Sequence, residues 1–180
     1  FNEESLLLPI IKDLLNDYKN LNLIIAPRHT ERSKELISLC SSFNLESYLI
    51  SERNKYSRGV AIIDSFGILS NYFNISDIVF LGGSLIEAGG HNPIEPALQK
   101  CAILTGPHIF NWEDIFNDMI EKNGVIKIQT NKDLRKTLNN LLRNESLISN
   151  MKINSFKFAQ KQFIDTVSLD EIINNYLNKC

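Results

Sequence analysis

This sequence has few cysteines, little net charge and no long hydrophobic run, and each shortage excludes a class of protein. The longest apolar stretches, such as residues 78–81, have the length of a strand, whereas a membrane-spanning helix needs about 20 apolar residues. A net charge of −2 gives no reason to expect nucleic acid as a partner, because nucleic-acid binding usually demands a basic face. The three cysteines, Cys40, Cys101 and Cys180, have no metal-type spacing, so we expect free thiols in a reducing compartment.

Two further shortages concern chemistry. No cluster of Asp, His and Cys predicts a metal site, and no serine elbow or Cys–His pair predicts a covalent nucleophile. We therefore expect neither a metal nor a cofactor. The chain begins Phe1-Asn2-Glu3-Glu4, without an initiator Met or a signal peptide, and enters a predicted helix almost at once. We expect a piece of a longer protein.

Strand-sized and helical apolar patterns alternate along the chain. The predicted strands cover residues 23–26, 48–50, 60–63, 78–81, 102–104 and 125–128. The predicted helices cover residues 3–19, 30–43, 67–75, a segment starting at 92 or 93, 111–121, 131–143, 146–163 and 168–177, and residues 51–59 read as a loop. This alternation predicts an α/β protein with a parallel, Rossmann-like sheet, one domain over residues 1–180 and a helical C-terminal tail.

Glycines are concentrated in one part of the chain, because six of the eight fall between residues 67 and 106. One pair follows a predicted strand and the other precedes a predicted helix. Such a loop lets backbone amides approach an anionic ligand at the carboxyl end of a parallel sheet. The spacing is not G-x-G-x-x-G, which argues against a nicotinamide enzyme. The predicted ligand loop contains Gly82, Gly83, Ser84, Gly90 and His91.

The residues after this loop, Asn92-Pro93-Ile94-Glu95, have two interpretations that the sequence leaves open. In the first, Asn92 caps a helix, Pro93 takes its first position and Glu95 completes a capping box. In the second, Glu95 accepts hydrogen bonds from ribose hydroxyls while the helix amides face a phosphate. Both interpretations require the same carboxylate.

Two weaker signals follow earlier strands. Pro27 ends the first strand, and Arg28 then stands where a guanidinium could bind a phosphate, or could simply be solvated. Residues 65–68 contain Gly67, which could let the backbone approach a base or ribose, or could form an ordinary turn.

Histidines and aromatic residues in the loops have structural interpretations first. His91 and His108 lie in loops bounded by Gly or Pro, where a histidine is more often a hydrogen-bonding group than a catalyst. Phe110 and Trp112 are interpreted as packing residues.

Together these stretches resemble the bacterial Kdo transferases, which add 3-deoxy-D-manno-octulosonic acid (Kdo) to lipid A precursors. Order and spacing both match over about residues 5 to 145. The matching stretches are Pro27-Arg28-His29-x-Glu31-Arg32, Asp64-Ser65-Phe66-Gly67-x-Leu69, Phe80-x-Gly82-Gly83-Ser84-Leu85, Gly89-Gly90-His91-Asn92-Pro93-x-Glu95-Pro96 and Gly106-Pro107-His108-x-Phe110-Asn111.

The resemblance implies a GT-B glycosyltransferase, with two Rossmann-like domains, of which this chain is the C-terminal, donor-binding one. It implies CMP-Kdo as donor, a lipid A precursor (lipid IVA) as acceptor, and a place at the cytoplasmic face of the bacterial inner membrane. The nucleotide contacts that it implies are Pro27, Arg28, Phe66, Gly67, Ile68, Asn92, Pro93, Ile94 and Glu95. Ile68 departs from the family, which usually has Glu there, so only a backbone contact carries over at this position.

The family's catalytic base is a Glu in the N-terminal domain, which also carries the membrane-anchoring segment and the acceptor pocket. We expect that domain to be absent from this chain, so no residue is assigned as a catalytic base and the chain alone is expected to be inactive. Two alternatives remain. One is an inactive nucleotide-binding remnant, and the other is a different nucleotide-sugar transferase or epimerase that shares the half-fold and prefers UDP.

Overall fold

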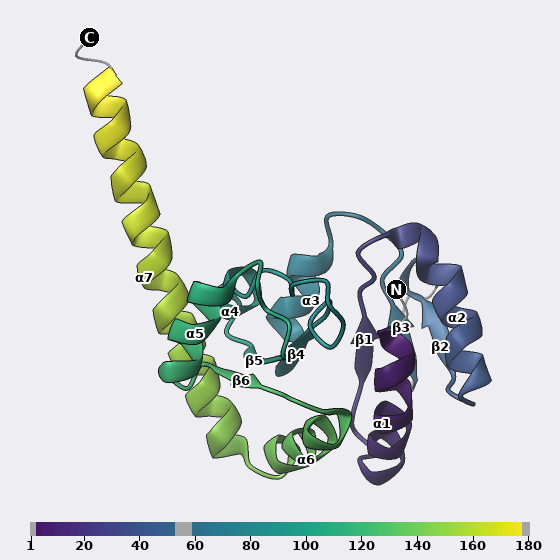
Figure 1. Cartoon of the computed structure of the whole chain (residues 1–180). Helices are drawn as coiled ribbons and strands as arrows, with labels where there is room; N and C mark the ends of the chain where they lie inside the picture. Colours follow the sequence, from purple (N-terminus) through teal and green to yellow (C-terminus); the bar gives the residue numbers. More distant parts are fainter. Residues whose placement is uncertain (1–2, 53–58, 178–180) are drawn as a thin grey trace. The chain divides into compact units, whose positions relative to one another are not determined.

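The computed structural model describes residues 3–52 and 59–177, with the backbone alone described for residues 163–177 (Figure 1). The chain divides into two compact units. Unit 1 comprises Phe1–Tyr72 and Thr130–Asn139, and unit 2 comprises Phe73–Gln129 and Asn140–Cys180.

Unit 1 is built on a parallel three-stranded sheet in the order β1-β3-β2. Its strands are β1 (Leu23–Ile25), β2 (Ser47–Leu49) and β3 (Val60–Ile62). Its helices are α1 (Glu4–Asp17), η1 (Thr30–Arg32), α2 (Ser33–Ser42) and η2 (Ile50–Glu52), while α3 (Leu69–Ile75) and α6 (Asn131–Leu142) cross the boundary between the units. The central strand β3 is buried along its whole length, as expected for a parallel strand with a neighbour on each side.

The core of unit 1 joins the two long helices to this sheet. Leu8 of α1 and Leu36 of α2 have no exposed surface, and both belong to one apolar cluster with Val60 and Ile62 of β3. The apolar faces of α1 and α2 recur at helical spacing in the sequence, which is why these helices form where the periodicity predicts them.

Unit 2 repeats the plan with a parallel sheet in the order β4-β5-β6. Its strands are β4 (Ile78–Leu81), β5 (Ala102–Thr105) and β6 (Val125–Lys127), and its helices are α4 (Ile94–Leu98), α5 (Glu113–Glu121) and α7 (Glu145–Leu177). Phe116 and Met119 of α5 pack on Ile103 of β5 in one buried cluster. Helix α7 contacts α4, α5 and β5, and Ser155 of α7 donates its hydroxyl to the Cys101 carbonyl at 2.9 Å.

The predicted α/β class, with parallel strands and a helical C-terminal end, is confirmed. The strands pair as two three-stranded sheets, and the single domain over residues 1–180 stays a prediction. Most element bounds differ from the sequence prediction by one or two residues, and η1 precedes α2 where one helix was predicted. Residues 53–58 of the predicted loop and Cys180 lie outside the described residues.

The prediction of two helices over residues 146–163 and 168–177 is wrong, because α7 is one continuous helix of 33 residues. No Gly or Pro occurs between residues 145 and 177, so nothing in this segment forces a helix to stop. Among the described residues, no helix is both long and apolar enough to cross a membrane.

Candidate functional site

Ser84 is the internal anchor of the glycine-rich loop in unit 2. Its side chain is 0% exposed, and its hydroxyl donates to the Leu81 carbonyl at 2.5 Å and accepts from the Gly106 amide at 2.7 Å. The Ser84 carbonyl accepts the His108 amide at 3.0 Å. Ser84 therefore ties the loop after β4 to the loop after β5, and its hydroxyl faces the protein interior.

The glycines of this region allow two loops to approach closely. A Cβ built on Gly106 would lie 2.2 Å from the Ser84 carbonyl oxygen. A Cβ on Gly89, whose φ is +90°, would lie 2.4 Å from Asn111 Nδ2 and 2.6 Å from a ring carbon of Phe110. Gly106 requires glycine for packing, because the atoms that its Cβ would meet belong to the backbone, whereas Gly89 requires glycine because of its positive φ.

Asn92 caps helix α4, as one of the two sequence interpretations predicts. Its Oδ1 accepts the Ile94 amide at 2.9 Å. Helix α4 is bounded as Ile94–Leu98, but Pro93 already has helical dihedral angles (φ −83°, ψ −14°), so it stands in the first helical position that this interpretation gives it. Among the described residues, the exposed Glu95 carboxylate has no hydrogen-bond or ion-pair partner, so no capping box forms. The Glu95 carboxylate is therefore available to a ligand.

Phe110 does not pack into the core, because the residue is 59% exposed, although its ring lies against Gly89. Trp112, by contrast, packs against the core cluster of unit 2. The sequence pattern did not predict that the ring of Phe110 would be exposed on the surface of its loop.

Arg28 and Phe66 lie at the same edge of the sheet in unit 1. Strands β1 and β3 are parallel neighbours with Ile25 opposite Ile62, and Arg28 and Phe66 follow their carboxyl ends. Pro27 is half-buried, and Arg28 is exposed. Among the described residues, the Arg28 guanidinium has no hydrogen-bond or ion-pair partner.

Arg32, four residues after Arg28, is an arginine of this unit whose charge is paired. It pairs with Glu4 at 3.0 Å and with Glu35 at 3.2 Å. Hydrogen bonds that Arg32 donates to the Glu35 and Glu4 carboxylates raise the pKa of Arg32, and the same pairing lowers the pKa of Glu35. The comparison leaves Arg28 as the arginine of the β1–α2 connection whose charge is uncompensated.

The turn after β3 exposes an aromatic ring. Phe66 is 74% exposed, Gly67 has φ +80° with open space around it, and Ile68 is half-buried. The turn starts at Asp64, whose carboxylate accepts both the hydroxyl and, at 3.2 Å, the amide of Ser51. The ring of Phe66 is thus presented to solvent, whereas an apolar residue of this size is normally buried.

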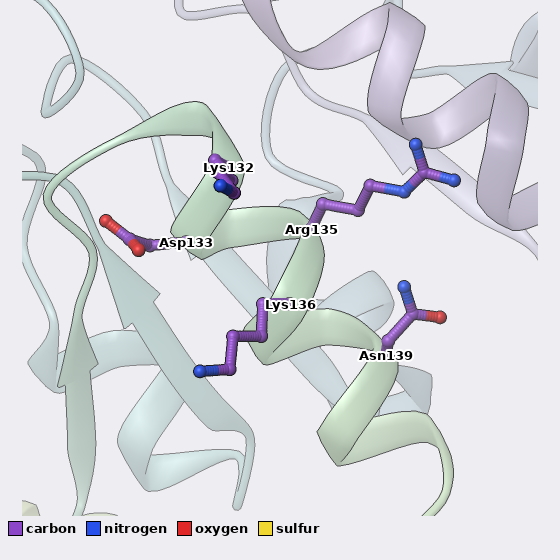
Figure 2. A pocket seen from close by; sticks show the side chains of 5 residues that line it. All are labelled: Lys132, Asp133, Arg135, Lys136 and Asn139. Atoms are coloured by element: carbon purple, nitrogen blue, oxygen red, sulfur yellow. The ribbon is translucent and has the colours of Figure 1, made fainter.

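A hollow of about 480 Å³ along α6 is lined by other residues (Figure 2). Its lining residues are Lys132, Asp133, Arg135, Lys136 and Asn139. Three of them already have partners in unit 1, because Asp133 pairs with Thr130, Arg135 with Asp13 and Asn139 with Tyr18. None of the predicted site residues lines this hollow, so the hollow does not correspond to the predicted ligand site. Among the described residues, no group of three or more His, Cys, Asp or Glu side chains could hold a metal ion.

The chain is similar to several proteins of known identity. The chain is 36% identical over 133 residues to the 3-deoxy-D-manno-octulosonic acid transferase of Haemophilus influenzae, and 31% identical over 180 residues to that of Rickettsia conorii. It also superposes on the C-terminal CMP-Kdo binding domain of WaaA from Acinetobacter baumannii with a TM-score of 0.82 and 30% identity, covering 88% of this chain and 84% of that one. The chain belongs to the 3-deoxy-D-manno-octulosonic acid transferase family.

Within this Kdo transferase family, the chain corresponds to the C-terminal domain of a GT-B glycosyltransferase. It spans about a third of the length of the curated relatives, 31% and 37% for the two named above. The C-terminal domain of a group 1 glycosyl transferase from Francisella tularensis shares the fold, with a TM-score of 0.58 at 15% identity. No protein-family model matches the chain.

Proposed function

We propose that this chain is the donor-binding part of a Kdo transferase, which transfers Kdo from CMP-Kdo to a lipid A precursor (lipid IVA) at the cytoplasmic face of the bacterial inner membrane. The observation that carries the proposal is the structural similarity to a domain described as binding CMP-Kdo, which extends over 84% of that domain. The lipid acceptor and the membrane location follow from the family resemblance.

Arg28 and Glu95 are proposed as the two polar anchors of the nucleotide. Arg28 carries an uncompensated charge suited to the CMP phosphate, and a guanidinium can bind it through two parallel hydrogen bonds. The exposed Glu95 carboxylate is suited to accept hydrogen bonds from the two ribose hydroxyls. Because α4 has only five residues, its dipole is short, and we assign most of the phosphate's stabilisation to Arg28.

Phe66 is proposed to lie against the cytosine base. A base stacked on an aromatic side chain gains about 1–3 kcal/mol, and the exposed ring of Phe66 has the free face that stacking needs. Gly67 and Ile68 contribute backbone contacts in this proposal, since the side chain of Ile68 can accept no hydrogen bond. Backbone contacts from Pro27, Asn92, Pro93 and Ile94, and from the loop residues Gly82, Gly83, Gly90 and His91, complete the proposed set.

The proposed reaction breaks the bond between the Kdo anomeric carbon and the CMP phosphate oxygen. A deprotonated 6′-hydroxyl of the lipid A precursor forms the new bond to that carbon, and CMP leaves with the electron pair. The negative charge that develops on the leaving phosphate is stabilised by Arg28. We assign no general base to this chain, and expect it to bind CMP by itself without transferring Kdo.

Calorimetric titration with CMP and UMP tests the donor assignment. We expect CMP to bind, and Arg28→Ala and Glu95→Ala each to weaken binding about 10- to 100-fold, because a hydrogen bond to a charged group contributes about 1.5–3 kcal/mol. Lys34→Ala and Glu121→Ala remove exposed charges elsewhere and should leave CMP affinity unchanged.

Other outcomes of this titration point to the alternatives. Tighter binding of UMP than of CMP would favour a different nucleotide-sugar enzyme. A well-folded chain that binds neither nucleotide would favour a decayed remnant, or a donor site that is assembled only when an N-terminal domain closes over it.

A further inference from the structure

We propose that Asn111 is a positioning residue that fixes the glycine-rich loop in its donor-binding conformation. Asn111 donates its backbone amide to the Gly89 carbonyl at 3.1 Å. Its side-chain Nδ2 donates to the Ala88 carbonyl at 3.0 Å and to the Gly90 carbonyl at 3.4 Å. One residue therefore holds three consecutive carbonyls of a loop that lies more than 20 positions earlier in the chain. The proposal rests on the proposed function, since the loop's ligand is the donor.

The fit between Asn111 and this loop depends on Gly89. The Asn111 amide group occupies the volume that a side chain at residue 89 would need, and the Phe110 ring covers the same glycine. The loop is also closed at its base, because the Gly90 amide donates to the Gly83 carbonyl at 2.9 Å. These contacts hold the backbone of residues 88–90 at both ends, and His91 and Asn92 follow directly in the chain.

The chemistry of Asn111 is specific to an amide. A neutral NH₂ group supplies two donors, which is what two carbonyls require. Asn111→Asp has nearly the same shape but puts a carboxylate oxygen in the place of Nδ2, against the Ala88 and Gly90 carbonyls, so two attractive contacts become repulsive. Asn111→Ala removes the donors without adding charge. Comparing the two variants separates the effect of losing the hydrogen bonds from the effect of replacing them with repulsive contacts.

The test measures CMP affinity by calorimetry and amide hydrogen exchange by NMR on the same variants. We expect Asn111→Asp to weaken CMP binding at least tenfold and Asn111→Ala to weaken it less. Exchange of the Gly90 amide should accelerate at least tenfold in Asn111→Asp, while the Ile103 amide in β5 keeps its wild-type rate. Asn154→Ala is the matched control, because Asn154 also donates Nδ2 to a backbone carbonyl of unit 2, that of Asn123 at 3.5 Å. It should change neither the CMP affinity nor the Gly90 exchange.

Two results would overturn the proposal. One is an Asn111→Asp variant that binds CMP within twofold of wild type with unchanged exchange at Gly90. The other is a loss of affinity accompanied by equally faster exchange at Ile103, which would mean that Asn111 supports the fold in general. If the wild-type chain binds no CMP, the donor assignment fails, and the exchange of Gly90 alone then decides whether Asn111 fixes the loop.

Discussion

Two of the buried hydroxyls in unit 2 differ in their hydrogen bonding, because one is hydrogen-bonded and the other has no partner among the described residues. Removing the first should lower the free energy of unfolding, and removing the second should not. Ser84 and Thr105 are both 0% exposed. The Ser84 hydroxyl bonds the Leu81 carbonyl at 2.5 Å and the Gly106 amide at 2.7 Å. The Thr105 hydroxyl has no hydrogen-bond partner among the described residues. The two substitutions Ser84→Ala and Thr105→Val remove the hydroxyls with little change in shape.

The expected magnitudes follow from what each removal leaves behind. Ser84→Ala leaves the buried Gly106 amide without its acceptor, which costs about 1–3 kcal/mol of unfolding free energy. For a chain of this size that lowers the melting temperature by roughly 2–12 °C. Thr105→Val removes a buried polar group that has no partner, so the free energy of unfolding should stay the same or rise by about 1 kcal/mol.

Chemical denaturation followed by tryptophan fluorescence measures both effects. Trp112 is the only tryptophan of the chain, and it packs against the core cluster of unit 2, so its signal reports on the unit that carries both substitutions. A Thr105→Val variant that loses as much stability as Ser84→Ala would refute the reasoning, because the number of hydrogen bonds would then not explain the difference between the two sites.

Two further predictions concern an exposed ring and a buried thiol. Phe66→Ala should weaken CMP binding by about 1–3 kcal/mol in calorimetry and leave the melting temperature unchanged, because the ring is 74% exposed; a lower melting temperature with unchanged affinity would assign Phe66 to the fold instead. Burial raises the pKa of Cys101 from 9.0 to about 11. The folded state thus holds its proton more tightly than the unfolded state, so this contribution to stability is complete below pH 9 and is lost as the pH rises to about 11. Urea unfolding at pH 8 and pH 10.5 should show this loss in the wild type and a smaller one in Cys101→Ala; equal losses in both would contradict the assignment.

The sequence predicted the elements well where the pattern is local. Helical spacing of Leu8 and Leu36 with their neighbours, and the short apolar runs of β3 and β5, depend on residues within one or two turns or within a single strand. The apolar pattern predicts two helices where α7 is continuous, because Asp165, Thr166 and Ser168 interrupt that pattern. Continuing a helix needs only that no residue stops it.

The candidate site was predicted as a set of segments, and its internal contacts were not. The motif around residues 82–95 and the Gly-Pro-His-x-Phe-Asn stretch stood out in the sequence, and their family assignment is confirmed. Nothing in the pattern predicted that Asn111 would hold residues 88–90, or that Phe110 would be exposed. The glycine pairs were read as access for a ligand, and the structure adds their role in close packing between two loops.

By itself the sequence determined the alternation of strands and helices, the family and the stretches that carry its motifs, because each depends on residue types at short separations along the chain. Only the tertiary structure decided that the Ser84 hydroxyl faces inward, that Arg28 and Glu95 are exposed without partners among the described residues, and that Asn111 reaches Gly89. Hydrogen bonds across about 20 residues, such as those of Ser84 and Asn111, form only when packing brings two loops together. That packing depends on every strand and helix beneath them.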